Sequence, residues 1–120
     1  MRTLIVLLLS LASTLAVAGY DIHITRKSFW ADDSGPKITF DQCQAYVHTD
    51  PQVVRDPANS PQDFLVSLPG ESFPLWYNAQ LGELYTKDPT DTAIRKLEDI
   101  ARSLHARVQG DDGEFYPSKP

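Results

Sequence analysis

One cysteine and three histidines are the first candidates in this sequence for a nucleophile, a general base or a zinc ligand near neutral pH. Cys43 would need a histidine beside it to become a reactive thiolate, and the candidates are His23, His48 and His105. No glycine or serine motif next to Cys43 marks an exposed nucleophile. The sequence therefore favours a small buried residue at this position over a catalytic thiol.

The spacing of the histidines matches no recognised catalytic or metal-binding motif. The sequence has neither a His-Glu-x-x-His segment nor a second cysteine, so no zinc site is expected. It also lacks the Gly-x-Ser-x-Gly segment that presents a nucleophilic serine. His23 falls on the polar side of a predicted strand, where a solvated or sheet-face side chain is expected. We assign no catalytic residue, no metal and no cofactor.

An acidic turn near the C-terminus offers carboxylate oxygens, which are the ligands that calcium prefers. The segment Gly110–Glu114 lacks the twelve-residue spacing of a calcium loop, and its glycines are explained by the positive φ that turns require. We therefore predict a plain turn. Its carboxylates, those of Asp111, Asp112 and Glu114, are expected to face a basic partner.

Two aromatic segments form the other candidate surface. Leu75–Asn78 and Glu83–Thr86 predict a β-hairpin, with Trp76 and Tyr85 on one sheet face and Tyr77 on the other. Tryptophan and tyrosine are enriched at binding hot spots, so all three aromatics are candidates for contact with a protein partner. Scattered exposed aromatics are also ordinary on an antiparallel sheet, and this alternative stays open.

The first half of the chain predicts a strand and a helix that position these residues. Apolar and polar residues alternate over Tyr20–Thr25, which predicts a half-buried strand. The segment Thr39–Gln42 matches a capping box, and the helix that it opens should end near Asp50-Pro51. Cys43 lies on the apolar face of this helix. Asp50–Gln62 contains three prolines and is expected to be an exposed connection.

The second half predicts the remaining elements. Phe64–Leu68 is a strand, and Asp88-Pro89 is expected to open the main helix, with aspartate as the cap and proline at the first position. Ala106–Gln109 is a short final strand. The buried stripe of the main helix is formed by Ile94, Leu97, Ile100, Ala101 and Leu104.

The order of these elements predicts the fold class. A β-α-β-β-β-α-β order indicates a small single-domain α+β sandwich, with a mostly antiparallel sheet and two helices on one face. No internal repeat or second domain is visible, so residues 19–120 are expected to form one domain.

Two ends of this domain resemble a family of small bacterial α+β proteins of unknown function. The resemblance is carried by the opening Tyr20-Asp21-Ile22-His23-Ile24-Thr25-Arg26 and the close Ala106-Arg107-Val108-Gln109-Gly110-Asp111-Asp112-Gly113-Glu114, with Ile38-Thr39 between them. It covers most of the chain after the leader and implies no established activity. Small proteins of this kind are often immunity or accessory proteins beside secreted toxins.

The first 18 residues are expected to be a cleaved signal peptide. Arg2 precedes the apolar residues Leu4–Val17, and Ala16-Val17-Ala18 fits the small-x-small cleavage pattern. The apolar stretch is shorter than the roughly 20 residues that span a bilayer. The mature chain is thus expected in the periplasm or outside the cell, with no stable membrane insertion.

The charge of the chain limits its partners. The formal net charge of −5 becomes −6 when Arg2 leaves with the leader, which argues against nucleic acid and favours a basic protein. The leading hypothesis is an exported partner-binding protein, such as an immunity protein or inhibitor that occludes an envelope-acting toxin. The alternative is a small envelope hydrolase, using Cys43 or a carboxylate pair, or a carbohydrate-binding protein. The sequence does not specify the oligomeric state.

Overall fold

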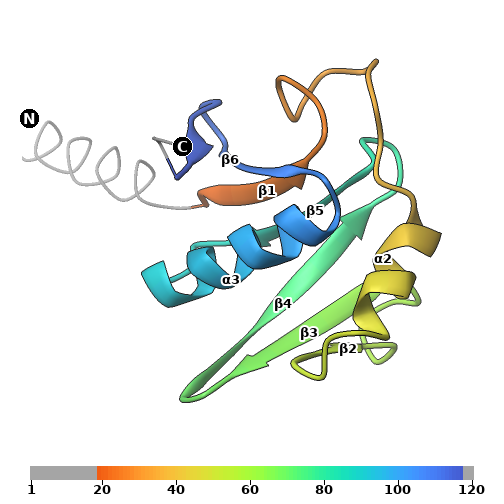
Figure 1. Cartoon of the computed structure of the whole chain (residues 1–120), viewed down its shortest axis with the longest axis vertical. Helices are drawn as coiled ribbons and strands as arrows, with labels where there is room; N and C mark the ends of the chain where they lie inside the picture. Colours follow the sequence, from red (N-terminus) through yellow and green to blue (C-terminus); the bar gives the residue numbers. More distant parts are fainter. Residues whose placement is uncertain (1–18, 118–120) are drawn as a thin grey trace, which may run out of the picture.

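Seven strands form one antiparallel sheet, and both helices pack against the same face of it (Figure 1). The structure is a computed structural model that describes residues 19–117. The strands lie in the order β2-β3-β4-β5-β1-β6-β7. The elements along the chain are β1 (Asp21–Thr25), α2 (Phe40–Val47), β2 (Val53–Arg55), β3 (Asp63–Leu68), β4 (Glu71–Asn78), β5 (Glu83–Lys87), α3 (Asp91–Ser103), β6 (Arg107–Gly110) and β7 (Phe115–Tyr116). The predicted α+β class is confirmed.

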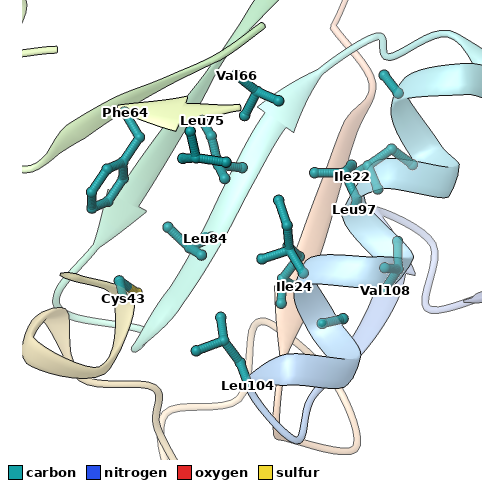
Figure 2. Close-up of a cluster of buried hydrophobic side chains, with 14 of the residues drawn as sticks. Ile22, Ile24, Cys43, Phe64, Val66, Leu75, Leu84, Leu97, Leu104 and Val108 are labelled. Atoms are coloured by element: carbon teal, nitrogen blue, oxygen red, sulfur yellow. The ribbon is translucent and has the colours of Figure 1, made fainter. Parts of the chain in front are cut away.

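The hydrophobic core lies between the two helices and the sheet (Figure 2). In β1, Ile24 sits between Leu84 of β5 and Val108 of β6, so three neighbouring strands present apolar side chains to the helices. Leu97 of α3 is completely buried against this face. The alternate residues of the same strands necessarily point to the opposite face, which carries no helix.

Helix α2 begins with the predicted capping box. The Thr39 hydroxyl accepts a hydrogen bond from the backbone N–H of Gln42 (3.1 Å), whose side-chain oxygen accepts from the backbone N–H of Thr39 (3.0 Å). This entry places Cys43 in the core, as expected. Burial raises the pKa of the Cys43 thiol to about 12. The thiol is therefore protonated and unreactive near neutral pH.

The prediction for the start of α3 is wrong by two residues. Thr90, not Asp88, is the N-cap, and its hydroxyl accepts from the backbone N–H of Ala93 (3.1 Å). Asp88 has a φ of 48°, and its carboxylate accepts from the backbone N–H of Tyr20 instead. An N-cap residue has an extended backbone, as Thr90 does with φ −69° and ψ 167°, and the positive φ of Asp88 does not fit that position.

Two strands that the sequence analysis did not predict widen the sheet at its edges. The expected exposed connection Asp50–Gln62 contains β2, in which Val53 is buried while Val54 and Arg55 are exposed. At the other edge, β7 pairs with β6 after the acidic turn. Both strands are two or three residues long, which is too short to show a period-two pattern.

Candidate functional site

A row of side chains crosses the helix-free face of the sheet, one from each of six neighbouring strands. Their backbones are paired in register from β3 to β7. We call this set the cross-strand row: Asp63, Trp76, Tyr85, His23, Gln109 and Phe115. The sequence neighbours of these residues on β1, β3, β4 and β5 contribute to the core, so the row itself points away from the helices.

The loop between β1 and α2 covers one half of this row. The indole of Trp30 stacks on the imidazole of His23, with ring centroids 3.9 Å apart and an interplanar angle of 9°. The Trp30 backbone N–H donates to the side-chain oxygen of Gln109 (2.7 Å), and its indole N–H donates to the carbonyl of Asp111 (3.1 Å). Arg26 fixes the start of the loop through two hydrogen bonds to the Leu104 carbonyl.

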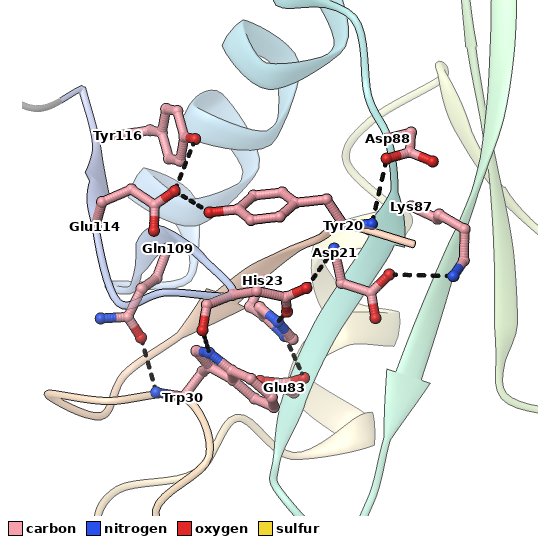
Figure 3. A network of polar contacts seen from close by, with 11 residues as sticks. Tyr20, Asp21, His23, Trp30, Glu83, Lys87, Asp88, Gln109, Glu114 and Tyr116 are labelled. Carbon is pink, nitrogen blue, oxygen red and sulfur yellow. Dashed lines mark hydrogen bonds and ion pairs between the residues drawn. The ribbon is translucent and has the colours of Figure 1, made fainter. Parts of the chain in front are cut away.

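Beneath Trp30, His23 bridges two carboxylates (Figure 3). Its Nδ1 lies 2.7 Å from Oε2 of Glu83, and its Nε2 lies 2.8 Å from Oδ1 of Asp111. The side chains of His23 and Glu83 are 3% and 1% exposed, and that of Asp111 is 26% exposed. We call these three residues the carboxylate–histidine bridge. Of the two expectations for His23, the position on the sheet face is confirmed and the solvated side chain is wrong.

The bridge holds His23 in its charged form. Burial by itself lowers the pKa of His23, but the hydrogen bonds to Glu83 and Asp111 outweigh it and hold the pKa above the ordinary value of 6.5. A protonated imidazole donates from both nitrogens, whereas a neutral one can donate to only one carboxylate. Glu83 retains one oxygen, Oε1, for which no described residue is a hydrogen-bond partner, and burial raises the pKa of this carboxyl.

The other half of the row is open and forms a shallow cavity of about 490 Å³. We call it the aromatic groove. It is lined by Asp21, Asp63, Trp76, Tyr77, Tyr85 and Lys87. The rings of Trp76 and Tyr85 are tilted by 47° with centroids 5.3 Å apart. Burial, followed by the negative charges of Asp21, Asp63 and Glu83, raises the pKa of Tyr85. The groove therefore has aromatic walls and a net negative charge.

The structure brings together only some of the partner-binding residues expected from the sequence. Trp76 and Tyr85 share the groove through their register, while the ring of Tyr77 packs beside Phe40 on the helix side. The Tyr77 hydroxyl donates to the carbonyl of Ile38 (2.8 Å). Tyr77 therefore borders the groove without offering its ring to it, and we leave it out of the proposed contacts.

The acidic turn mostly serves the fold. Asp111 belongs to the bridge and also accepts from the backbone N–H of Asp21 (2.8 Å). The Glu114 carboxylate accepts from the hydroxyls of Tyr20 and Tyr116, and its hydrogen bond raises the pKa of Tyr20 to about 12. Only Asp112 remains exposed without such a role. Within residues 19–117, no group of three or more His, Cys, Asp or Glu residues is arranged to hold a metal ion.

Sequence reasoning missed several residues of this site, among them Trp30, Asp21, Asp63 and Glu83. Trp30 lies in a polar loop, Asp21 and Glu83 fall at ordinary polar positions of predicted strands, and Asp63 falls just before the predicted strand Phe64–Leu68. The available signal was a tryptophan in a loop that otherwise has little apolar content.

No family model, curated protein or solved structure matched the chain. In the described part of the chain, no helix has the length and apolar character needed to cross a membrane.

The bridge predicts a pH-dependent stability. Because the pKa of His23 is raised in the folded protein, its stabilisation is fully present below the unfolded value of 6.5 and is lost as the pH rises through the folded pKa. We expect the free energy of unfolding of the wild type to exceed that of His23→Gln by an amount that is largest below about pH 6.5 and shrinks as the pH rises above it. Urea unfolding at several pH values measures this difference.

The control for this measurement is His48→Gln, which changes a histidine on the surface. Its free energy of unfolding should run parallel to that of the wild type over the same pH range. A constant difference between the wild type and His23→Gln would show that His23 does not carry the bridging charge.

Proposed function

We propose that this chain is an exported binding protein that docks a protein partner on the aromatic groove. The observation that supports this most directly is the side-by-side placement of Trp76 and Tyr85 on an open sheet face. Large aromatic side chains held in a cavity are typical of binding hot spots, because they bury much apolar area at a small entropic cost.

The rigid surroundings of the groove favour binding. The two aromatics stand on central strands of the sheet, and the adjoining half of the same face is closed by Trp30 over the carboxylate–histidine bridge. A site on paired strands loses little conformational freedom when the partner binds. The groove can therefore act as a preformed recognition surface.

The charge of the groove supports a basic partner. Asp21 and Asp63 line the groove, and the negative charge of Glu83 also acts on Tyr85. Such a surface attracts a positively charged protein and repels phosphates and anionic lipid. The chain would then work by occlusion, as an immunity protein or inhibitor that covers a basic site on an envelope-acting toxin. The export part of this proposal depends on residues 1–18, which lie outside the described residues.

The alternative of a small hydrolase has less support. Cys43 is buried in the core, and burial raises the pKa of its thiol to about 12, so a thiol mechanism is disfavoured. The tilted aromatic pair of the groove would also suit stacking against a sugar ring, which keeps carbohydrate binding as a second candidate. The two classes of ligand differ in charge, and this difference separates them by experiment.

Trp76→Ala is expected to weaken partner binding by about 2 kcal/mol, which is roughly thirtyfold in Kd. The partner is first captured from envelope extract of the source cells on the purified protein, then purified itself. Its affinity for the wild type and the variant is measured by isothermal titration calorimetry. Partner capture that is lost with Trp76→Ala would support the proposal.

The matched control is Val54→Ala, which shortens an exposed apolar side chain on a strand outside the groove. It should leave the affinity unchanged. Equal affinities for the wild type and Trp76→Ala would place the partner on another surface, and retention of a polysaccharide in place of a protein would favour the carbohydrate alternative.

A further inference from the structure

We infer that the aromatic groove binds an arginine side chain of the partner, with its guanidinium beside the carboxylates of Asp21 and Asp63 and over the Tyr85 ring. This inference rests on the proposed function and adds the chemical class of group that the site recognises. Four observations on the described residues carry it: the charge of the groove, an unused acceptor, the loose ion pair at its rim and the aromatic pair.

The first observation is the charge of the groove. Two of its lining side chains are carboxylates, and Lys87 is the only basic one among the described residues that line it. Asp63 pairs across the sheet with Trp76, whereas Asp21 pairs with Lys87, so the two carboxylates come from strands on either side of the aromatic pair. A cation in the groove would therefore meet negative charge from two directions.

The second observation is an unused hydrogen-bond acceptor. Oδ1 of Asp21 is buried, and no described residue donates a hydrogen bond to it. A buried acceptor without a donor is unfavourable, because it has lost its water without replacement. A guanidinium presents five N–H donors in one plane, so it could satisfy this oxygen while also reaching a second carboxylate.

The third observation is the position of Lys87. Its ammonium lies 3.7 Å from Oδ1 of Asp21, beyond hydrogen-bond distance, and its side chain is 54% exposed. An exposed and loose ion pair contributes little to stability, so an incoming cation can displace this lysine at small cost. A guanidinium that hydrogen-bonds to Asp21 would therefore replace the Lys87 ammonium beside this carboxylate.

The fourth observation is the geometry of the two rings. Trp76 and Tyr85 are tilted by 47° with centroids 5.3 Å apart, so their faces are neither parallel nor perpendicular. Negative faces of aromatic rings attract cations, and the flat guanidinium stacks on them better than a compact ammonium does. Arginine therefore fits this groove better than lysine, and a neutral sugar would leave both carboxylates without a counter-charge.

The experiment uses single-residue probes, so it does not depend on knowing the partner. Nα-acetyl-arginine amide, its uncharged analogue Nα-acetyl-citrulline amide, Nα-acetyl-lysine amide and the neutral sugar chitobiose are titrated into the isotope-labelled protein at low salt. Binding is followed by NMR from the indole N–H of Trp76 and the amide of Tyr85. We expect saturable shifts with the arginine probe, and affinity at least about tenfold weaker for each of the others.

Three variants test the residues that the inference names. Asp21→Asn and Asp63→Asn should each weaken arginine binding by about fivefold or more, because each removes one negative charge. Asp33→Asn is the matched control in an exposed loop and should leave it unchanged. Lys87→Gln should strengthen binding about threefold, because the competing cation is gone. A variant that merely damaged the fold would not bind more tightly.

Several results would overturn the inference: equal binding of citrulline or lysine, tighter binding of chitobiose, no saturable shift with arginine, or weaker binding by Lys87→Gln. These outcomes are distinct from failure of the proposed function. A captured partner whose affinity depends on Trp76 but not on Asp21 would keep the docking surface and reject the arginine. Arginine binding in the absence of any captured protein would keep the arginine site and count against the docking of a protein partner.

Discussion

His23→Ala is expected to lower the free energy of unfolding by about 3–5 kcal/mol, as the loss of one partner from a buried ion pair usually does. The variant removes the cation between Glu83 and Asp111, so each carboxylate loses its hydrogen-bonded counter-charge. The side chain of Glu83 is 1% exposed, so water cannot stabilise its charge in place of the imidazole. Trp30 also loses the imidazole on which its ring stacks.

Urea unfolding followed by tryptophan fluorescence measures this loss. Adding Glu83→Gln to His23→Ala should restore part of the stability, because the buried negative charge is then removed as well. His48→Ala, on the surface, should change the free energy of unfolding by about 0.5 kcal/mol or less. If His23→Ala lost less than about 1 kcal/mol, the bridge would contribute no more than a surface ion pair.

Phe64→Ala is expected to lower the free energy of unfolding by about 3–5 kcal/mol, because it deletes a large ring from a packed core. Phe64 is 1% exposed and lies on β3, where it faces Leu75 of β4. Its ring centroid is 5.7 Å from that of Phe40, at the start of α2. The substitution would therefore open a cavity where α2 joins the sheet.

The same substitution at Phe29 is the control for core packing. This ring is 39% exposed and lies in the loop before α2, so Phe29→Ala should cost about 1 kcal/mol or less. Chemical denaturation of both variants under one set of conditions gives the comparison. Equal losses at the two positions would mean that the core collapses around the missing Phe64 ring.

Local patterns in the sequence predicted most of the regular elements. The alternation of β1, the capping box at Thr39 and the apolar stripe of α3 involve residues close in the chain, where propensity and periodicity act directly. The burial of Cys43 followed from its helix face. The errors, at Asp88 and in β2, fall where a single turn or a two-residue shift decides the outcome.

The candidate site could not be predicted in the same way. The partners of His23 lie 60 and 88 residues away, and they meet only because β5 and the end of β6 flank β1. The stacking of Trp30 depends on how a loop folds back over the sheet. The sequence did place Trp76 and Tyr85 on one sheet face, and the structure adds the register that makes them direct neighbours, but the carboxylates beside them come from other strands.

The position of β1 has a consequence for when the chain can fold. Among the strands of the described residues this one is made first, yet it pairs with β5 and β6, and β6 ends at residue 110. Its ladder with β5 needs the chain up to residue 87 and its ladder with β6 needs the chain up to residue 110, and such distant pairings make folding slow. The central ladder between β1 and β6 therefore forms only after β6 has been made, so the β1 edge that pairs with β6 stays open until then.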